Sequence, residues 1–275
     1  MPELPEVETI VRTIAPAVRG RTILNLGRGW PATLRPTLRT ARRMVLGARV
    51  QDVSRRGKFV VVRIIPPGCP ESIRVVFIHL RMSGRLAVGR DRPPEWRHVR
   101  FWLEFDDGSR LWLDDARKFA RVIVSDDPAG FLAGLGAEPL GRGLGPRRFA
   151  ALVHSRRRWI KPLLLDQSVV AGLGNIYTDE ALHAAGIHPL RRSDRLSSSE
   201  LVRLYRTIRG VLKEGIGRNG ASIDWVYPGG RMQDRFRVYG RADEPCRTCG
   251  ARVRRIVVGQ RGTWFCPGCQ RVRSR

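Results

Sequence analysis

The spacing of apolar residues predicts a helix at the start of the chain and a series of strands after it. Apolar side chains recur at helical intervals from Val7 to Ile14, and Gly20 is expected to end this helix. Short segments rich in Val, Ile, Phe and Trp follow, separated by Gly, Pro or Asp turns, which is typical of an antiparallel sandwich. The expected strands cover residues 57–65, 73–80, 98–105, 110–113 and 119–124.

The second half of the chain changes to helical spacing. Residues 134–146 are rich in Gly and Pro and are interpreted as a linker. Beyond them, the apolar periodicity predicts helices at 149–157, 176–185 and 197–216. A chain of 275 residues is long enough for about two domains, so we expect an α+β, multidomain protein.

The charge of the chain indicates its partner. Lysine and arginine number 51 against 25 acidic residues, a formal net charge of +26, which favours a polyanion such as nucleic acid. No apolar run approaches the ~20 residues that a membrane span needs, and no secretory signal pattern is present. We therefore expect a cytoplasmic protein with no membrane partner, although a basic protein of the membrane surface is an alternative.

Four cysteines form two CxxC pairs near the end of the chain. Cys246 and Cys249 are followed, after sixteen intervening residues, by Cys266 and Cys269. Four thiolates at this spacing can hold one structural Zn²⁺, and residues 252–265 between them are expected to fold as a β-hairpin. Two disulfides are the alternative, which a cytoplasmic location disfavours. Because all four ligands are cysteine, no coordination position is left open for catalysis.

The first residues of the chain suggest covalent chemistry. Removal of Met1 would make Pro2 a free secondary amine, a nucleophile that can form a cationic iminium with a sugar carbon. Glu3 and Glu6 stand close enough in sequence to manage protons beside that amine. Taken alone, a proline followed by glutamates is also an ordinary helix start.

Several basic residues are further candidates. Only four of the basic residues are lysines, and the others are arginines. A lysine such as Lys58 or Lys161 in so arginine-rich a chain is a weak indication of amine chemistry, because an ammonium group can lose its proton and a guanidinium cannot. Arg261 falls at the tip of the expected hairpin, where it could reach a phosphate. The glycine-rich turn at 170–177 feeds a helix and is either a phosphate site or a plain connection between helices.

The chain resembles the bacterial formamidopyrimidine-DNA glycosylases of the zinc-finger type over essentially its whole length. Independent motifs occur in the family's order. They are MPELPEVET at 1–9, RGK at 56–58, HLRMSG at 79–84, DARKF at 115–119, GNIY at 174–177, and the zinc module with QR at 260–261.

This resemblance implies a bifunctional base-excision repair enzyme that binds damaged double-stranded DNA as a monomer. It implies removal of oxidised purines, 8-oxoguanine and formamidopyrimidines, followed by strand cleavage through β,δ-elimination, with one structural Zn²⁺ and no redox cofactor. The implied domains are a catalytic β-sandwich flanked by helices at 1–133, the linker at 134–146, a helix-two-turns-helix domain at 147–230, and a zinc-finger β-hairpin at 231–275.

The resemblance also implies catalytic roles, residue by residue. Pro2 matches the Schiff-base nucleophile, Glu3 the general acid/base, and Glu6 a supporting carboxylate. Lys58 matches the proton donor of β-elimination. Arg261 matches the residue assigned to δ-elimination, where it is either a proton donor or a phosphate clamp, because guanidinium rarely gives up a proton.

A second set of positions matches residues that engage DNA. Met82, Arg117 and Phe119 match the residues that fill the hole left by the extruded nucleotide, although strand packing is the default alternative for Met82 and Phe119. The matched phosphate contacts are His98, Arg156, Lys161 and Asn175.

The sequence departs from the family pattern in two places. Ala120 follows Phe119 where glycine is usual, and a minor effect is expected from this small residue. The segment from Trp225 to Val238 is shorter than the family's base-capping loop, which affects base recognition more than strand cleavage. Two rival functions are a pyrimidine-specific enzyme of the endonuclease VIII type and a non-enzymatic DNA-binding protein with a zinc ribbon.

Overall fold

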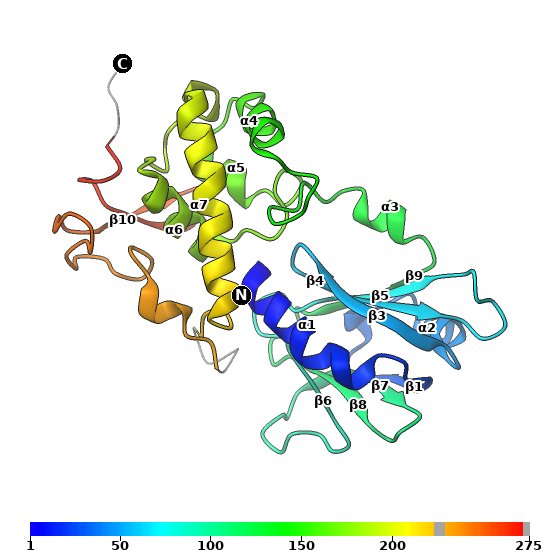
Figure 1. The fold of residues 1–275 in the computed structure, drawn as a ribbon. Helices are drawn as coiled ribbons and strands as arrows, with labels where there is room; N and C mark the ends of the chain where they lie inside the picture. Colours follow the sequence, from blue (N-terminus) through cyan, green and yellow to red (C-terminus); the bar gives the residue numbers. More distant parts are fainter. Residues whose placement is uncertain (223–228, 272–275) are drawn as a thin grey trace. The chain divides into compact units, whose positions relative to one another are not determined.

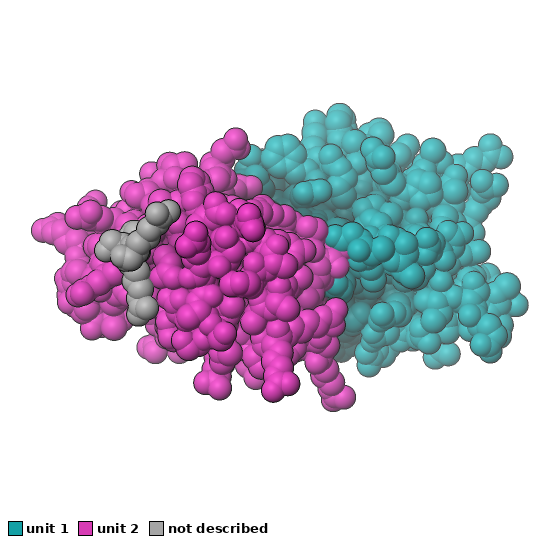
Figure 2. Space-filling model, turned by 90° about the horizontal axis from the view of Figure 1, so that it is seen from above, with its two compact units in different colours: residues 1–2, 6–134, 222–228 teal, residues 3–5, 135–221, 229–275 magenta. Residues whose placement is uncertain are grey.

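The computed structural model describes residues 1–222 and 229–271. The chain forms two compact units, drawn in different colours in Figure 2. Unit 1 contains Met1–Pro2, Glu6–Gly134 and Ser222–Pro228, and unit 2 contains Glu3–Pro5, Leu135–Ala221 and Gly229–Arg275. None of the helices in the described ranges is long and apolar enough to cross a membrane.

Unit 1 contains two β-sheets (Figure 1). All strand pairs are antiparallel except β2 with β9, which is parallel. The four-stranded sheet runs β1 (Ile23–Arg28), β7 (Val99–Phe105), β8 (Arg110–Asp114) and β6 (Arg85–Gly89). The five-stranded sheet runs β2 (Leu34–Arg35), β9 (Arg121–Ser125), β5 (Arg74–His79), β4 (Phe59–Ile65) and β3 (Arg49–Arg56).

One apolar core joins the two sheets and the first helix, as expected of a sandwich. It includes Val62 and Ile78 from one sheet, Phe101 and Leu113 from the other, and the apolar face of α1 (Leu4–Val18). The opposite face of the five-stranded sheet packs Val61 and Phe77 against side chains of α3 (Pro128–Leu132). Because β4 is buried on both faces, its sequence is a near-continuous apolar run. Two short elements complete unit 1, η1 (Pro31–Thr33) and α2 (Leu38–Val45).

Unit 2 is helical and ends in the zinc hairpin. The longest helix, α7, begins with a reciprocal capping box between Ser197 and Glu200. The helical elements are α4 (Pro146–His154), α5 (Ile160–Leu165), α6 (Asn175–Ala185), η2 (Ser193–Arg195), α7 (Ser198–Gly217) and η3 (Met232–Arg235).

The expected hairpin between the cysteine pairs is present. Strands β10 (Arg254–Val258) and β11 (Arg261–Phe265) pair antiparallel. The two turn residues, Gly259 and Gln260, both have positive φ, which is the conformation of a type I′ turn. Arg261 is therefore the first residue of β11, directly after the turn.

The structure corrects the expected linker at 134–146. The boundary between the units falls between Gly134 and Leu135, and the residues after it belong to unit 2. The carbonyl oxygen of Leu144 accepts from the Tyr205 hydroxyl, and that of Pro139 accepts from Arg209, both on α7. The glycines and prolines of this stretch thus form a packed segment of unit 2.

The expected short base-capping loop, Trp225 to Val238, lies partly outside the described residues, which leave out 223–228. The remainder includes η3, whose Met232 is buried and donates its backbone N–H to the Gly220 carbonyl oxygen.

Candidate active site and zinc centre

The Glu3 carboxylate lies at the N-terminus of α6. It is buried, and its oxygens accept hydrogen bonds from the backbone N–H groups of Gly174 at 2.7 Å, Ile176 at 2.9 Å and Tyr177 at 3.4 Å. A helix N-terminus carries unpaired amides and partial positive charge, so it stabilises a carboxylate. The glycine-rich turn therefore holds a side chain of the protein at this helix end, where a bound phosphate was one of the two expectations.

Two glycines make this arrangement sterically possible. A Cβ on Gly174 would lie 2.3 Å from the carboxyl carbon of Glu3, far inside van der Waals contact. Gly172 has a φ of +100°, and a Cβ there would lie 2.8 Å from a methyl carbon of Leu4. The Leu4 backbone N–H donates to the Gly172 carbonyl oxygen at 3.0 Å. The turn thus fixes the chain on both sides of Glu3.

The other catalytic candidates near the chain start belong to unit 1. Pro2, Glu6 and Lys58 are buried. Lys58 follows Gly57 in the two-residue turn between β3 and β4, and Gly57 has a φ of +58°. The Arg55 guanidinium holds this turn by donating to the Gly57 carbonyl oxygen at 2.9 Å. Lys58 is therefore positioned by the tight turn of a β-hairpin.

A buried carboxylate organises the two loops that carry the expected wedge residues. Asp115 is fully buried and accepts hydrogen bonds from the Ser83 hydroxyl, the Arg117 N–H at 3.2 Å and the Ala120 N–H at 2.7 Å. Ser83 lies in the loop after β5, and the other two lie in the loop before β9. Ala120 does not have a positive φ, so alanine fits where the family usually has glycine.

The side chains that these loops present are exposed. Met82 is 42% exposed and Phe119 is 43% exposed, so neither side chain belongs to the buried core. The Arg117 guanidinium lies 4.9 Å from the centre of the Phe119 ring. Strand packing, the alternative for Met82 and Phe119, does not account for them.

His79 is the last residue of β5, directly before the loop that carries Met82. Its Nδ1 accepts the backbone N–H of Arg81 at 3.0 Å, and its ring packs edge-on against Phe59. Burial, followed by the nearby charges of Arg81 and Lys58, lowers the pKa of His79 to about 3. This histidine is therefore neutral and acts as an acceptor that fixes the loop carrying Met82.

The expected phosphate contacts differ in exposure. His98 is exposed, and Arg156 is partly exposed, two residues after the end of α4. Asn175 begins α6, and its side-chain amide donates to the Gly262 carbonyl oxygen at 2.9 Å. Arg261, next to that carbonyl, is exposed.

Lys161 is in a different environment from that of a phosphate contact. Its side chain is 0% exposed and forms an ion pair of 2.6 Å with Asp179, which is 1% exposed. The Lys161 ammonium also donates to the Gly262 carbonyl oxygen at 3.0 Å. Burial lowers the pKa of Lys161, and the adjacent Asp179 carboxylate opposes that shift. Lys161 therefore holds the hairpin beside Arg261.

The four cysteines form one cluster. The sulfurs of Cys246 and Cys269 are 3.9 Å apart, and those of Cys249 and Cys266 are 3.4 Å apart. Four thiolates at such separations suit a tetrahedral Zn²⁺, and the structure contains none of the disulfides that were the alternative. Cys246, Cys249, Cys266 and Cys269 are the residues that would hold one structural zinc ion.

Sequence reasoning missed two buried carboxylates, Asp115 and Asp179. A third, Glu180, was expected near the lesion pocket from the resemblance, and it accepts the backbone N–H groups of Arg237, Val238 and Tyr239 at 2.8–2.9 Å. Glu180 therefore anchors the chain that enters the zinc module. For Asp179 and Glu180, the signal in the sequence was an acidic pair inside an otherwise apolar helix. Such a pair indicates partners elsewhere in the chain, because buried carboxylates are rare without them.

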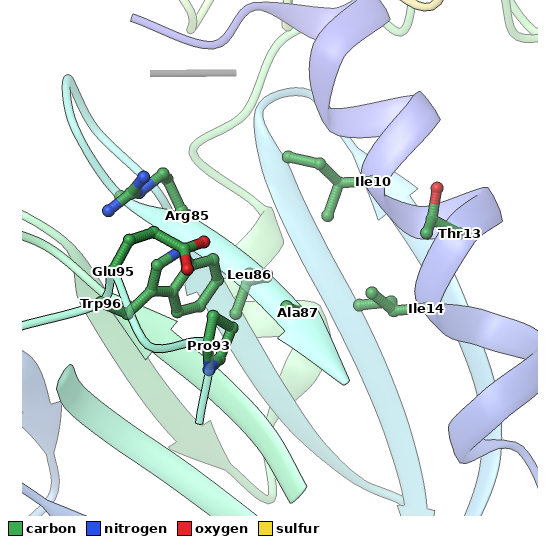
Figure 3. Close-up of a pocket in the computed structure, with 10 residues that line it drawn as sticks. Ile10, Thr13, Ile14, Arg85, Leu86, Ala87, Pro93, Glu95 and Trp96 are labelled. Carbon is green, nitrogen blue, oxygen red and sulfur yellow. The ribbon is translucent and has the colours of Figure 1, made fainter. Parts of the chain in front are cut away.

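A separate hollow lies in unit 1 between α1 and β6 (Figure 3). It has a volume of about 360 Å³ and is lined mainly by apolar side chains, among them Ile10, Ile14, Leu86 and Trp96. None of the predicted catalytic residues lines it.

Known proteins of one family match this chain from its first domain to its zinc finger. Residues 1–122 match the formamidopyrimidine-DNA glycosylase N-terminal domain, residues 135–226 its H2TH domain, and residues 243–272 the zinc finger found in FPG and IleRS. The formamidopyrimidine-DNA glycosylase of Chloroflexus aurantiacus is 42% identical, over 98% of each chain. That of Symbiobacterium thermophilum is 41% identical, over 99% of this chain and 90% of the relative.

Solved structures of DNA-bound proteins of this family also match the fold of this chain. The structure of MutM in complex with DNA containing carbocyclic 8-oxo-G has a TM-score of 0.89 and 32% identity, over 98% of this chain and 100% of that one. The Lactococcus lactis Fpg in complex with DNA containing an abasic site has a TM-score of 0.87 at 32% identity, with the same coverage. The chain belongs to the formamidopyrimidine-DNA glycosylase family.

Proposed function

We propose that this protein is a DNA glycosylase and abasic-site lyase of base excision repair that acts on 8-oxoguanine and formamidopyrimidine lesions. The observation that supports it best is the buried Glu3 carboxylate, fixed by three amides at the start of α6 and joined directly to Pro2. A carboxylate held this rigidly beside a chain-end amine suits proton transfer during attack on a sugar.

The glycosylase step begins at Pro2. With Met1 removed, the Pro2 nitrogen attacks C1′ of the damaged nucleotide, and the bond from C1′ to the base breaks. The Glu3 carboxylate takes the proton that the Pro2 amine loses and passes it to the sugar ring oxygen as the ring opens, leaving a cationic iminium between Pro2 and C1′. Glu6, buried in the first turns of α1, supports the charge near the amine.

The lyase steps follow from the iminium. The cation acidifies the hydrogen on C2′, and loss of that proton expels the 3′ phosphate in β-elimination. Lys58, presented by the β3–β4 turn, supplies the proton-transfer group for this step. Loss of the 5′ phosphate follows in δ-elimination, in which the exposed Arg261 either transfers the proton or clamps the phosphate.

Recognition requires the damaged nucleotide to leave the stack. Met82 and Phe119 are the exposed apolar side chains that fill the vacated space, and Arg117 hydrogen-bonds the orphaned cytosine. His98, Arg156 and Asn175 bind phosphates of the duplex. We assign Lys161 to the support of the hairpin, since its ammonium is buried against Asp179.

The net charge of +26 suits a protein held on DNA by its phosphates. We place the enzyme in the bacterial cytoplasm, associated with the nucleoid through DNA, where it acts as a monomer. The zinc ion has a structural role, because four cysteines leave it no open position for a substrate.

Replacement of Glu3 by glutamine tests the proposal. Glu3→Gln retains the size of the side chain but cannot act as an acid or base, so we expect base excision to fall about 100-fold or more. Binding to a duplex with an abasic-site analogue should remain within about threefold of wild type, because the DNA-contacting residues are unchanged. Single-turnover excision of 8-oxoguanine measures the first effect. Excision at the wild-type rate would remove Glu3 from the mechanism.

A further inference from the structure

One face of α6 contacts the zinc module through polar side chains. Asp179 accepts the Trp264 backbone N–H at 2.9 Å, and Glu180 accepts three N–H groups between Arg237 and Tyr239. One turn further along the helix, His183 lies against the zinc ligand Cys246. These residues explain why α6 is buried along nearly its whole length although it contains acidic and basic groups.

His183 lies as close to three of the cysteines as those three lie to one another. It is buried, and its Nε2 lies 3.4 Å from the Cys246 sulfur. The ring nitrogen and the sulfurs of Cys246, Cys266 and Cys269 all lie within 4.8 Å of one another. The imidazole is therefore either a metal ligand itself or a hydrogen-bond donor to a ligand.

The environment of the other ring nitrogen separates these two roles. A histidine that binds zinc through Nε2 carries its proton on Nδ1 and donates it to a carboxylate, carbonyl or water. In the described residues, Nδ1 of His183 is buried and has no hydrogen-bond partner. A proton there would be an unsatisfied buried donor, whereas a proton on Nε2 points at the Cys246 sulfur. The four cysteines, moreover, already fill the coordination of zinc.

We propose that His183 donates a hydrogen bond from Nε2–H to the zinc-bound thiolate of Cys246 and so fastens the zinc module to α6. Four thiolates around one Zn²⁺ leave a net charge of −2, and Cys246 and Cys266 are both buried. A donor aimed at one sulfur stabilises that charge and lowers the reactivity of the thiolate. The Thr248 backbone N–H, 3.4 Å from the same sulfur, is a second donor.

The variant His183→Phe tests this role, because it retains a ring but removes the donor. We expect zinc release to a chelator from the folded holoprotein to become about tenfold faster, and alkylation of Cys246 by N-ethylmaleimide to accelerate. His188→Asn is the matched control, since His188 is equally buried and asparagine keeps an acceptor for the Leu190 N–H, and it should behave as wild type. Zinc release and Cys246 alkylation at wild-type rates in His183→Phe would overturn the proposal.

A measurement on the unmutated protein covers the case in which the variant does not fold. With ¹¹³Cd in place of zinc, the Nε2–H proton of His183 should show a scalar coupling to the metal through the sulfur, and the Nε2 nitrogen should show no one-bond coupling. A direct nitrogen–metal coupling would show that His183 is a metal ligand. Absence of both couplings would show that His183 makes no hydrogen bond to a metal-bound sulfur. Either of these results would contradict the proposal.

Discussion

The Glu3 carboxylate occupies the space that a side chain at residue 174 would need. Gly174 has an extended backbone, with φ −132° and ψ −161°, which any residue can adopt. The restriction is therefore steric, because a Cβ on Gly174 would collide with the carboxyl group of Glu3. The position of the acid/base candidate is thus fixed by a residue more than 170 positions away in the chain.

Gly174→Ala should displace Glu3 and lower base excision by about 100-fold, because a displacement of ~1 Å at a reacting group has effects of that size. Gly210→Ala in α7 is the matched control, since a Cβ there meets nothing within 4 Å. The control should keep full activity and gain about 0.5–1 kcal/mol in free energy of unfolding, as alanine replaces glycine in a helix. Excision kinetics and thermal unfolding measure both variants. Full excision by Gly174→Ala would show that Glu3 does not need this position.

His79 should make unit 1 less stable in acid. Its pKa is about 3 in the folded protein and 6.5 in the unfolded chain, so between these values only the unfolded chain binds the proton. The free energy of unfolding therefore falls as pH decreases from 6.5 to 3, by at most about 1.4 kcal/mol per pH unit from this group.

His79→Asn keeps an acceptor for the Arg81 N–H and removes the titration. The difference in free energy of unfolding between pH 7 and pH 5, measured with guanidinium chloride, should be smaller in this variant. His154→Asn changes an exposed histidine and should leave that difference unchanged. An equal pH dependence in wild type and His79→Asn would contradict the burial argument.

At the scale of elements, two loops of the sandwich are tied by a single carboxylate. Asp115 receives donors from the loop with Met82 and from the loop with Phe119. Within the second loop, Lys118 has a φ of +61°, an uncommon conformation for a residue other than glycine. The loops therefore present their apolar tips in a preformed arrangement.

Asp115→Ala should weaken binding to a duplex with an abasic-site analogue by about tenfold or more, which corresponds to ~1.4 kcal/mol. The physical reason is that two backbone N–H groups and the Ser83 hydroxyl lose their acceptor, so the loops must be ordered during binding. Asp126→Ala, an exposed aspartate after β9, is the control. Equal affinities of the two variants in an equilibrium binding assay would contradict this role for Asp115.

The elements that sequence predicted best are those with strong periodicity. The expected helix at 176–185 corresponds to α6, and the one at 197–216 to α7. The short elements α2, α3 and α5 and the strands β1, β2, β3 and β6 were not predicted, because their apolar positions are too few to define a period. Asp179 and His183 inside α6 had no assignable role, since the motif matches do not show which residues they contact. Asp179 contacts Lys161 and Trp264, and His183 contacts Cys246.

At the scale of the whole chain, the family, the zinc ligands and the DNA partner were predictable because their signals are local motifs and total charge. The fold class was confirmed as a β-sandwich followed by a helical domain and a zinc hairpin. Lys161 shows the limit of motif matching. A motif match gives the type of residue at a position but not whether its side chain is buried. In this chain the Lys161 ammonium is buried in an ion pair with Asp179, which suits a structural role.

The central claim, an amine at Pro2 that attacks the damaged nucleotide, is tested by borohydride trapping on a duplex with one 8-oxoguanine opposite cytosine. Duplexes with thymine glycol and without damage serve as comparisons, and Pro2→Gly serves as the control protein. We predict a covalent adduct that maps to Pro2 and forms on the 8-oxoguanine duplex, with most of it lost in Pro2→Gly. An adduct formed only with thymine glycol, or tight binding with no adduct on any duplex, would contradict the account.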